Sequence, residues 1–322
     1  MTVCKGRARL SSIALLWVGA SPAVWAQGAS PADPAPRQDA PPLAASPVTS
    51  PSSLPAPADA STTGAPRAEP RRLREEPLWE LGAGVASLQL PHYRGSEQSR
   101  FWALPLPYFV YRGQFLRADR EGARAVLLER SLIEIDLSVA GSAPARSEGN
   151  RAREGMPDLA PTFEVGPNAN LTFARGPDWK VELRAPVRAA FTVQGSSRHI
   201  GWTASPYLTA EWVQGGWDLG VRAGGLWGDR RFHGYIYDVA PEYATAARPA
   251  FRAAGGSAGW QATAGASRRF GSWWVGAFVR ADSVRGSAFA ASPLVTQPDT
   301  WAAGIAVSWV FARSSVLVKV PD

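Results

Sequence analysis

The chain has 322 residues, a formal net charge of +7 and a hydrophobic content of 45%. Three of its cations, Lys5, Arg7 and Arg9, lie in a predicted export signal, so the excess left for the rest of the chain is too small to indicate nucleic-acid binding. The single cysteine, Cys4, lies in the same signal, which excludes disulfides and thiol catalysis in the exported chain.

Residues 1–26 predict a secretory signal peptide. The three cations precede a short apolar run from Leu10 to Ala20, and small residues follow at Val24-Trp25-Ala26, as at a cleavage site. The apolar run is too short to cross a membrane as a helix. We therefore expect the chain to be exported and its fold to begin after this signal.

Residues 27–76 predict a disordered arm rich in Pro, Ala and Ser. The arm contains eleven prolines and no aromatic residue, so it cannot bury enough apolar surface to fold. Two roles are open for it. It is either a plain spacer or a tether to a periplasmic partner or to peptidoglycan.

From Trp79 onward, apolar residues alternate with polar or small ones, as in strands whose two faces meet different surroundings. The clearest example sets Leu183, Ala185 and Val187 against Glu182, Arg184 and Arg188. A strand at 101–111 is apolar on both faces and contains Pro105 and Pro107, which suit a sheet edge or a bulge. The pattern predicts twelve strands, near residues 79–85, 101–111, 114–119, 123–128, 133–139, 163–173, 181–193, 202–212, 217–227, 260–266, 273–281 and 301–311.

Aromatic residues stand at the ends of several apolar faces. In the stretch 301–311, Trp301 opens the face and Trp309 and Phe311 close it, with aliphatic residues between them. A soluble domain would bury its 14 tryptophans, whereas a membrane barrel places such residues at the two bilayer interfaces. The spacing of about ten residues matches one tilted crossing of a bilayer.

The connections between the predicted strands alternate in length. Short turns are expected near 112–114, 129–131, 175–178, 214–216 and 269–272, and mostly long segments at 89–100, 120–122, 141–159, 194–200, 228–257 and 284–299, of which only 120–122 is short. Outer-membrane barrels combine short periplasmic turns with long external loops. A secreted β-sandwich would explain the strands but not this alternation. The predicted fold class is therefore all-β, a transmembrane outer-membrane barrel over residues 77–322 whose N-terminal arm lies in the periplasm.

The faces opposite the apolar ones carry charges of both signs, expected to point into the lumen. A structural network of ion pairs would use such a mixture, whereas a selective pore would favour a ring of one sign. Both interpretations stay open. The residues are Glu80, Glu134, Asp136, Glu164, Lys180, Glu182, Arg184, Arg188, Asp218, Arg222, Arg280 and Asp282.

Short motifs spread over 77–315 carry a family resemblance. They include Pro91-His92-Tyr93-Arg94-Gly95-Ser96, Leu104-Pro105-Leu106-Pro107-Tyr108, Gly155-Met156-Pro157-Asp158-Leu159, Glu164-Val165-Gly166-Pro167, Pro186-Val187-Arg188, Tyr237-Asp238-Val239, Arg248-Pro249-Ala250-Phe251 and Ser292-Pro293-Leu294-Val295. In this order, the motifs resemble the MipA/OmpV family of outer-membrane proteins. The Pro-rich arm lies outside the resemblance, and the tail after Phe311 departs from the terminal aromatic common in barrels.

The resemblance implies a non-enzymatic scaffold. Its founding member is described as joining a lytic transglycosylase to a penicillin-binding synthase, which couples murein cleavage to murein synthesis. Other members are regarded as surface antigens or porin-like channels. The family has no attributed catalytic, cofactor or metal residues, so the resemblance assigns none here.

Enzymatic alternatives are weak. Gly255-Gly256-Ser257-Ala258-Gly259 matches the nucleophile-elbow pattern, but no histidine follows it and no helix is evident there. The three histidines, His92, His199 and His233, all lie in or beside predicted loops, where His92 or His199 could serve a hydrolase together with Ser96. They show no paired spacing of the kind that binds metals.

Overall fold

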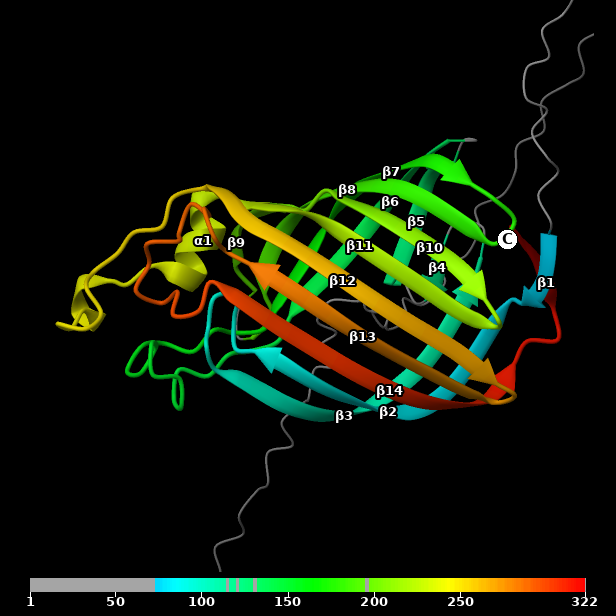
Figure 1. The fold of residues 1–322 in the computed structure, drawn as a ribbon, viewed down its shortest axis with the longest axis horizontal. Helices are drawn as coiled ribbons and strands as arrows, with labels where there is room; N and C mark the ends of the chain where they lie inside the picture. Colours follow the sequence, from blue (N-terminus) through cyan, green and yellow to red (C-terminus); the bar gives the residue numbers. More distant parts are fainter. Residues whose placement is uncertain (1–72, 114–115, 120–121, 130–131, 195–196, 322) are drawn as a thin grey trace, which may run out of the picture. The chain divides into compact units, whose positions relative to one another are not determined.

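The computed structural model describes residues 73–321, with gaps at 114–115, 120–121, 130–131 and 195–196. The predicted signal peptide, and the predicted arm as far as residue 72, lie outside this part. Most of the described chain is β-strand, with very little helix (Figure 1). Within it, no helix is long and apolar enough to cross a membrane.

The strands form one closed antiparallel barrel. Apart from β9 and β10, each strand pairs with its neighbours in sequence, and the last closes on the first through pairs such as Val307 with Val85. The strands are β2 (Trp79–Pro91), β3 (Ser99–Arg112), β4 (Leu116–Asp119), β5 (Gly122–Glu129), β6 (Ile133–Ser142), β7 (Thr162–Arg175), β8 (Trp179–Thr192), β9 (His199–Ala204), β10 (Tyr207–Gln214), β11 (Trp217–Gly228), β12 (Gly256–Phe270), β13 (Trp273–Ser283) and β14 (Asp299–Arg313).

Strands β9 and β10 share one position in the barrel wall. Both pair with β8 on one side and with β11 on the other, and only Ser205 and Pro206 separate them. Proline has no backbone N–H to give to a ladder, so the strand predicted at 202–212 is interrupted there. Twelve strand positions therefore surround the lumen, and the prediction of a twelve-stranded outer-membrane type of barrel is confirmed.

The barrel has two unlike ends. The long connections gather at one end, which we call the loop end, and the short turns lie at the other, the turn end (Figure 1). The longest connection, between β11 and β12, folds into helix α1 (Arg230–Tyr237) and the short helix η1 (Pro241–Tyr243). Asp229 caps α1 by accepting a hydrogen bond from the Phe232 N–H at 2.8 Å.

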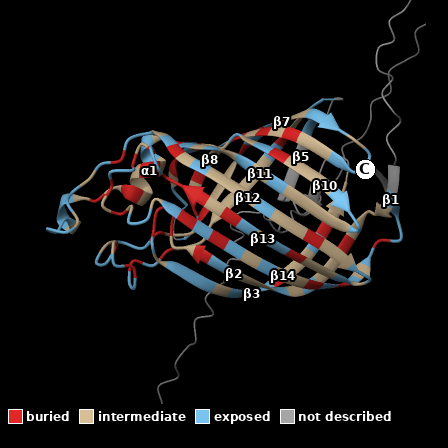
Figure 2. Cartoon of the chain, in the orientation of Figure 1, coloured by how far each residue is buried: buried red, intermediate tan, exposed pale blue. Residues whose placement is uncertain are grey.

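The outer face is apolar with aromatic residues at both margins. Val85, Val187 and Ile305 are exposed along the middle, while Glu80 and Asp136 on the inward face are buried. An alternation of exposed and buried positions is clearest along β14 (Figure 2). Two belts follow: Phe101, Trp202, Trp227, Trp260 and Trp301 near the loop end, and Phe173, Trp179, Phe270, Trp273, Trp309 and Phe311 near the turn end. Such belts mark the two interfaces of a bilayer.

A second, two-stranded sheet corrects the predicted limits of the arm. Leu73–Pro77 forms β1, which pairs antiparallel with β15 (Leu317–Pro321), so the last residues assigned to the disordered arm are a strand. Neither strand was expected, because neither shows a long alternating face. Backbone bonds from Leu78 N to Val316 O and from Ser314 N to Trp79 O join this sheet to the turn end of the barrel.

The lipid-facing assignment can be tested at two adjacent residues of β8. Val187→Arg should block barrel assembly, because a cation near the bilayer midplane costs ~2–4 kcal/mol. Arg188→Ala, which changes the lumen side, should do much less damage. Heat-modifiable electrophoretic mobility measures the folded fraction, and equal losses in the two variants would contradict the assignment.

Candidate functional site

The turn-end half of the lumen is filled by a hydrogen-bonded network. Glu182 accepts from Arg184 at 2.9 Å and lies 3.4 Å from the Lys180 ammonium, and Glu211 approaches the same two cations. Close by, Asp136 accepts hydrogen bonds from amides, with Asn170 donating at 2.7 Å. Paired groups of this kind occupy space and cancel one another's field.

On the opposite wall of the turn-end half, Glu80 is almost fully buried and accepts from Arg269 at 2.6 Å. Tyr108 also donates to this carboxylate, and its ring lies 5.9 Å from that of Trp274. Large side chains therefore project into the lumen from several strands.

Above this network lies a chamber of about 610 Å³. Its walls come from β3, β6, β8 and β11, and its cover comes from the long loops. Leu90, Trp102 and Ala140 make one side apolar, and Arg188, Arg222 and Arg280 lie on strands of the opposite side. This volume lies within the range of small-molecule pockets.

The chamber has an excess of positive charge. Among the described residues, six arginines and two glutamates line it. Arg280 binds Asp282 at 2.7 Å, and Arg94 binds the other oxygen of the same carboxylate at 3.0 Å. Arg188 instead donates to the hydroxyls of Ser138 and Ser205, and Glu164 accepts from Thr203.

Arg222 is the least neutralised of these cations. Its guanidinium lies 5.6 Å from the Tyr207 ring centroid, and the described residues place no carboxylate within salt-bridge distance of it. Such a cation–π contact holds the side chain but leaves its charge available. Among the five cations expected to face the lumen, Arg188 and Arg222 are thus the two for which the described residues provide no carboxylate within salt-bridge distance.

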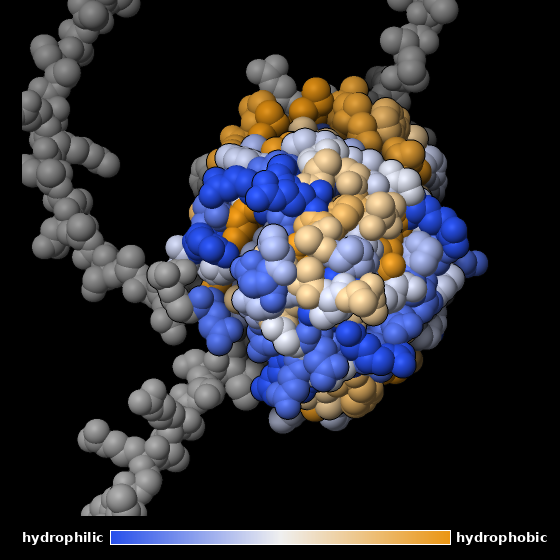
Figure 3. All heavy atoms as spheres, turned by 90° about the vertical axis from the view of Figure 1, so that its left-hand side faces the viewer, coloured by the Kyte–Doolittle hydropathy of each residue, from blue (hydrophilic) through white to orange (hydrophobic). Residues whose placement is uncertain are grey.

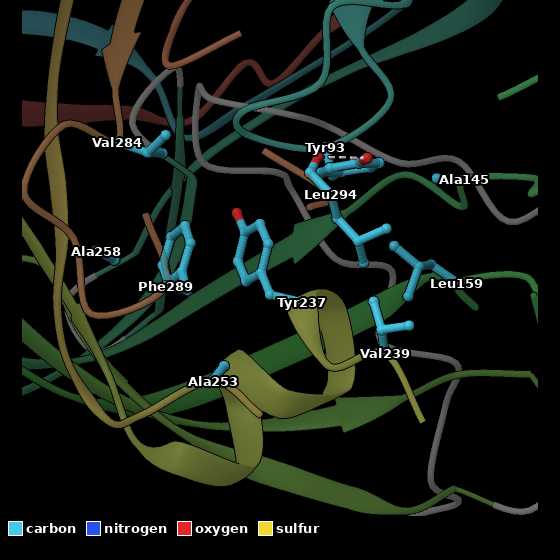
Figure 4. Packing of buried hydrophobic residues seen from close by; sticks show 10 residues of the cluster. All are labelled: Tyr93, Ala145, Leu159, Tyr237, Val239, Ala253, Ala258, Val284, Phe289 and Leu294. Carbon is cyan, nitrogen blue, oxygen red and sulfur yellow. Dashed lines mark hydrogen bonds between the residues drawn. The ribbon is translucent and has the colours of Figure 1, made fainter. Parts of the chain in front are cut away.

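A compact apolar cluster of loop residues roofs the chamber (Figure 4). Tyr237 of α1 stacks on Phe289 with ring centroids 3.6 Å apart, and Tyr93 meets Tyr237 edge to face at 6.2 Å. Val284 and Leu294 are fully buried in the same cluster. Seen from the loop end, hydrophilic residues dominate the face, hydrophobic ones lie mostly at its margins, and side chains cover its middle (Figure 3).

Several residues of the sequence motifs meet in this roof. The Tyr93 hydroxyl donates to Leu294 O and the Tyr237 hydroxyl to Arg94 O, both at 2.8 Å. Burial raises the pKa of Tyr93 to about 12 and the pKa of Tyr237 further, so both remain protonated donors. Ser292 donates to Tyr237 O at 2.8 Å. The motifs at 91–96, 237–239 and 292–295 are therefore parts of one structure.

Two further motif residues fix the loop backbones. Gly95 has φ of +91°, which favours glycine, and its carbonyl accepts from the N–H groups of Thr296 and Gln297. Arg248 donates to Ala152 O, Glu154 O and Tyr243 O, which joins the longest loop to the loop between β6 and β7. Pro249 and Pro293 lie beside these contacts in sequence, and Pro91 ends β2.

The remaining motif residues lie in the barrel wall. A Cβ on Gly166 would overlap the carbonyl of Val187, so glycine permits the close approach of β7 and β8. Pro167, the next residue, is on the exposed outer face. Ser96 lies in the β2–β3 loop, where its hydroxyl bonds Gln98 O and the Asn150 amide.

Comparison with known families decides the relationship. Residues 81–311 match the family described as MltA-interacting protein MipA. The chain belongs to this MipA family. No curated protein matches the sequence.

Solved structures of similar shape are distant from this MipA-family chain. An outer-membrane channel from Pseudomonas putida F1 is 13% identical with a TM-score of 0.40, over 77% of this chain and 100% of the other. A bacterial polysaccharide outer-membrane secretin is 8% identical with a TM-score of 0.35, over 72% and 99%. A porin is 12% identical with a TM-score of 0.26, over 72% and 100%. At these values we draw nothing about function from them.

The three histidines occupy separate surroundings. His92 Nδ1 lies 2.9 Å from the Asn150 amide, and Ser96 bonds that same amide without bonding His92. His199 packs on Phe191 and Trp202. Ser257 lies within strand β12 and accepts from the Gly259 N–H, so it is not at a strand-to-helix turn. Among the described residues, no group of three or more His, Cys, Asp or Glu could hold a metal.

Sequence reasoning missed much of the roof. Arg94, Arg153 and Phe289 were not singled out, because loop residues have no period that reveals their partners. Arg153 joins three loops: it donates to Ile236 O and Pro157 O, and its guanidinium lies 5.8 Å from the Tyr93 ring centroid. The available signal was the number of apolar residues in the loops, such as Val284, Phe289 and Leu294, which solvated loops would not need.

The roof should weaken in acid through His233. Its Nδ1 lies 2.8 Å from Ala254 O and must donate to it, which leaves Nε2 unprotonated in the apolar roof. Burial lowers the pKa of His233 below its usual 6.5. The unfolded loop then binds the proton more readily, so roof stability is lost as pH falls below about 6.5.

His233→Asn keeps a donor near Ala254 and cannot titrate there. Hydrogen exchange of residues 230–237 at pH 7.5 and 5.5 should show the acid effect in the wild type but not in this variant, and a shared effect would assign it to another group.

Proposed function

We propose that this chain is a non-conducting outer-membrane scaffold that holds a murein lytic transglycosylase and a penicillin-binding synthase together during cell-wall turnover. The observation that carries the proposal is the network in the turn-end half of the lumen, where the Glu182–Arg184 and Glu80–Arg269 pairs occupy the bore. A barrel with such a network is suited to act through its surfaces. The family name, MltA-interacting protein, supports a murein transglycosylase as one partner. In this proposal the barrel performs no chemistry itself.

We infer that partners dock at the turn end. The β1–β15 sheet lies there outside the barrel wall, and each of its two strands has one edge that the other does not cover. An uncovered edge can accept a partner strand through main-chain hydrogen bonds. Arg112 supports this sheet through Glu76 at 2.7 Å and Pro77 O at 2.9 Å. The predicted periplasmic arm leads directly into β1, so it would extend from the same surface and could tether peptidoglycan.

Affinity capture from native membranes tests the scaffold. The mature protein should retain a lytic transglycosylase and a penicillin-binding synthase. Replacing Leu317–Pro321 with Gly and Ser of equal length should reduce that capture, because β1 would lose its partner strand. The matched control replaces residues 244–249 at the loop end and should capture normally. Recovery of no murein enzyme by the mature protein would refute the proposal.

A small porin-like channel is the second candidate, and the observation in its favour is the chamber of about 610 Å³. We expect no stable channel of porin size in planar bilayers, because the turn-end half of the lumen stays filled. Replacing loop residues 229–255 with a short Gly-Ser turn should raise conductance only slightly. Large, regular, ion-selective steps from the intact protein would favour the channel over the scaffold.

A further inference from the structure

One edge of strand β3 has almost no partner. Within the described residues, β3 pairs with β4 only at Tyr111 and Arg112, and β4 ends at Asp119. The following strand, β5, runs back along β4 and β6 and not along β3. From residue 99 to residue 109, the second edge of β3 therefore faces no described strand.

The prolines of β3 lie on that open edge. Arg112 donates its N–H to Leu78 O at 2.8 Å, and β3 keeps an unbroken register with β2 from there to Ser99. In such an antiparallel pair, alternate residues direct both backbone groups to the same side, so the even residues of β3 face β2 and the odd ones face the open edge. Pro105 and Pro107 are odd. Proline has no backbone N–H, so these two residues remove two hydrogen-bond donors from an edge that faces no described strand.

The chamber lies behind this edge. Described pairing between β5 and β6 stops at Ser138, which leaves residues 139–142 as the other rim. Trp102 of β3 and Ala140 of β6 both line the chamber, as do the exposed residues Arg100 and Arg146. We call this opening, with β3 and β6 as its sides and the β4–β5 hairpin toward the turn end, the side window. Unpaired backbone groups at membrane depth are tolerated where they line a water-filled cavity, and water in the chamber would satisfy those of this edge.

The loop side of the window is closed by a polar clamp. Gln98 donates to Gly149 O at 2.7 Å and accepts from the Arg151 N–H at 2.6 Å, and Arg151 pairs with Glu97 at 2.8 Å. The roof cluster around Tyr237 and Phe289 covers the axial way out. The chamber thus communicates with the outside at the wall, close to the belt residue Phe101.

The lining of the chamber selects the chemistry of a ligand. Trp102 and Ala140 offer an apolar surface near the window, and Arg188 and Arg222 lie deeper with no described carboxylate in contact. Arginine binds carboxylates through paired N–H donors, and its strength increases where water is excluded. A molecule with an apolar body and one anionic group would satisfy both regions.

We propose that the chamber binds an amphipathic organic carboxylate, which reaches it from the lipid through the side window between β3 and β6. The apolar body lies against Trp102, and the carboxylate meets Arg188 and Arg222. This binding is independent of the scaffold role, because it uses the lumen and the wall and not the turn-end sheet.

Equilibrium binding of radiolabelled 4-phenylbutyrate to the full mature protein in lipid nanodiscs tests the site, with empty nanodiscs as background. Saturable binding is expected, at least tenfold tighter than that of the neutral analogue 4-phenylbutanol. Arg222→Gln and Arg188→Gln should each weaken binding about tenfold. Arg268→Gln, whose side chain contacts Trp217 and Phe270 near the turn end, should leave it unchanged. Heat-modifiable mobility confirms that each variant is folded.

Association rates test the route. Ala140→Trp adds bulk at the rim of the window and should slow association at least fivefold. Arg231→Trp adds the same bulk to the exposed face of α1 and should not. Equal binding of the alcohol and the carboxylate, or full binding by folded Arg222→Gln, would overturn the anion site. Unchanged association in Ala140→Trp, or equal slowing in the two tryptophan variants, would overturn access from the side.

Discussion

Backbone hydrogen bonding in a lipid environment is the constraint on which the rest of this structure depends. The bilayer core offers no water to an unpaired N–H or C=O, so the sheet must close upon itself. Closure through β14 and β2 meets that requirement almost everywhere. Closure also determines what each face of the wall contacts. Alternate residues of a strand face either the lipid or the lumen, so Val85 lies on the outer face and Glu80 on the inner one.

The lumen is divided by how its charges are satisfied. Near the turn end, Glu182 and Glu80 are bound by cations, and Asp136 is bound by amides. Nearer the loops, cations outnumber carboxylates among the described lining residues, and the Arg222 guanidinium lies over the Tyr207 ring. A filled half suits a barrel that does not conduct, and a cationic half with an apolar wall suits capture of an anion. Both properties coexist because they occupy different depths of one bore.

Much of the barrel was predictable because the strand period is local. Alternation in 181–193 identifies a strand without knowledge of its neighbours, and the outward position of Val187 follows from the same count. The roof was not predictable in this way, since Tyr93 and Leu294 belong to loops 201 positions apart. The side window was predictable only in part. Pro105 and Pro107 suited a sheet edge or a bulge, but the short lengths of β4 and β5, which leave one edge of β3 unpaired, became known only from the structure. The β1–β15 sheet escaped notice because five-residue strands carry too little pattern.

The roof has a consequence for the order of assembly. Its partners come from the loops after β2, β6, β11 and β13, and the β2 and β13 loops lie on opposite sides of the β14–β2 seam. The ring stacking of Tyr237 on Phe289 and the hydroxyl bond from Tyr93 to Leu294 therefore cannot both form while that seam is open. The cluster is a late product of biogenesis, completed only after the last strand has zipped onto the first. A chain arrested before that step would leave the Tyr93 hydroxyl without the Leu294 carbonyl that accepts its hydrogen bond, and the apolar cluster without its member from the β2–β3 loop.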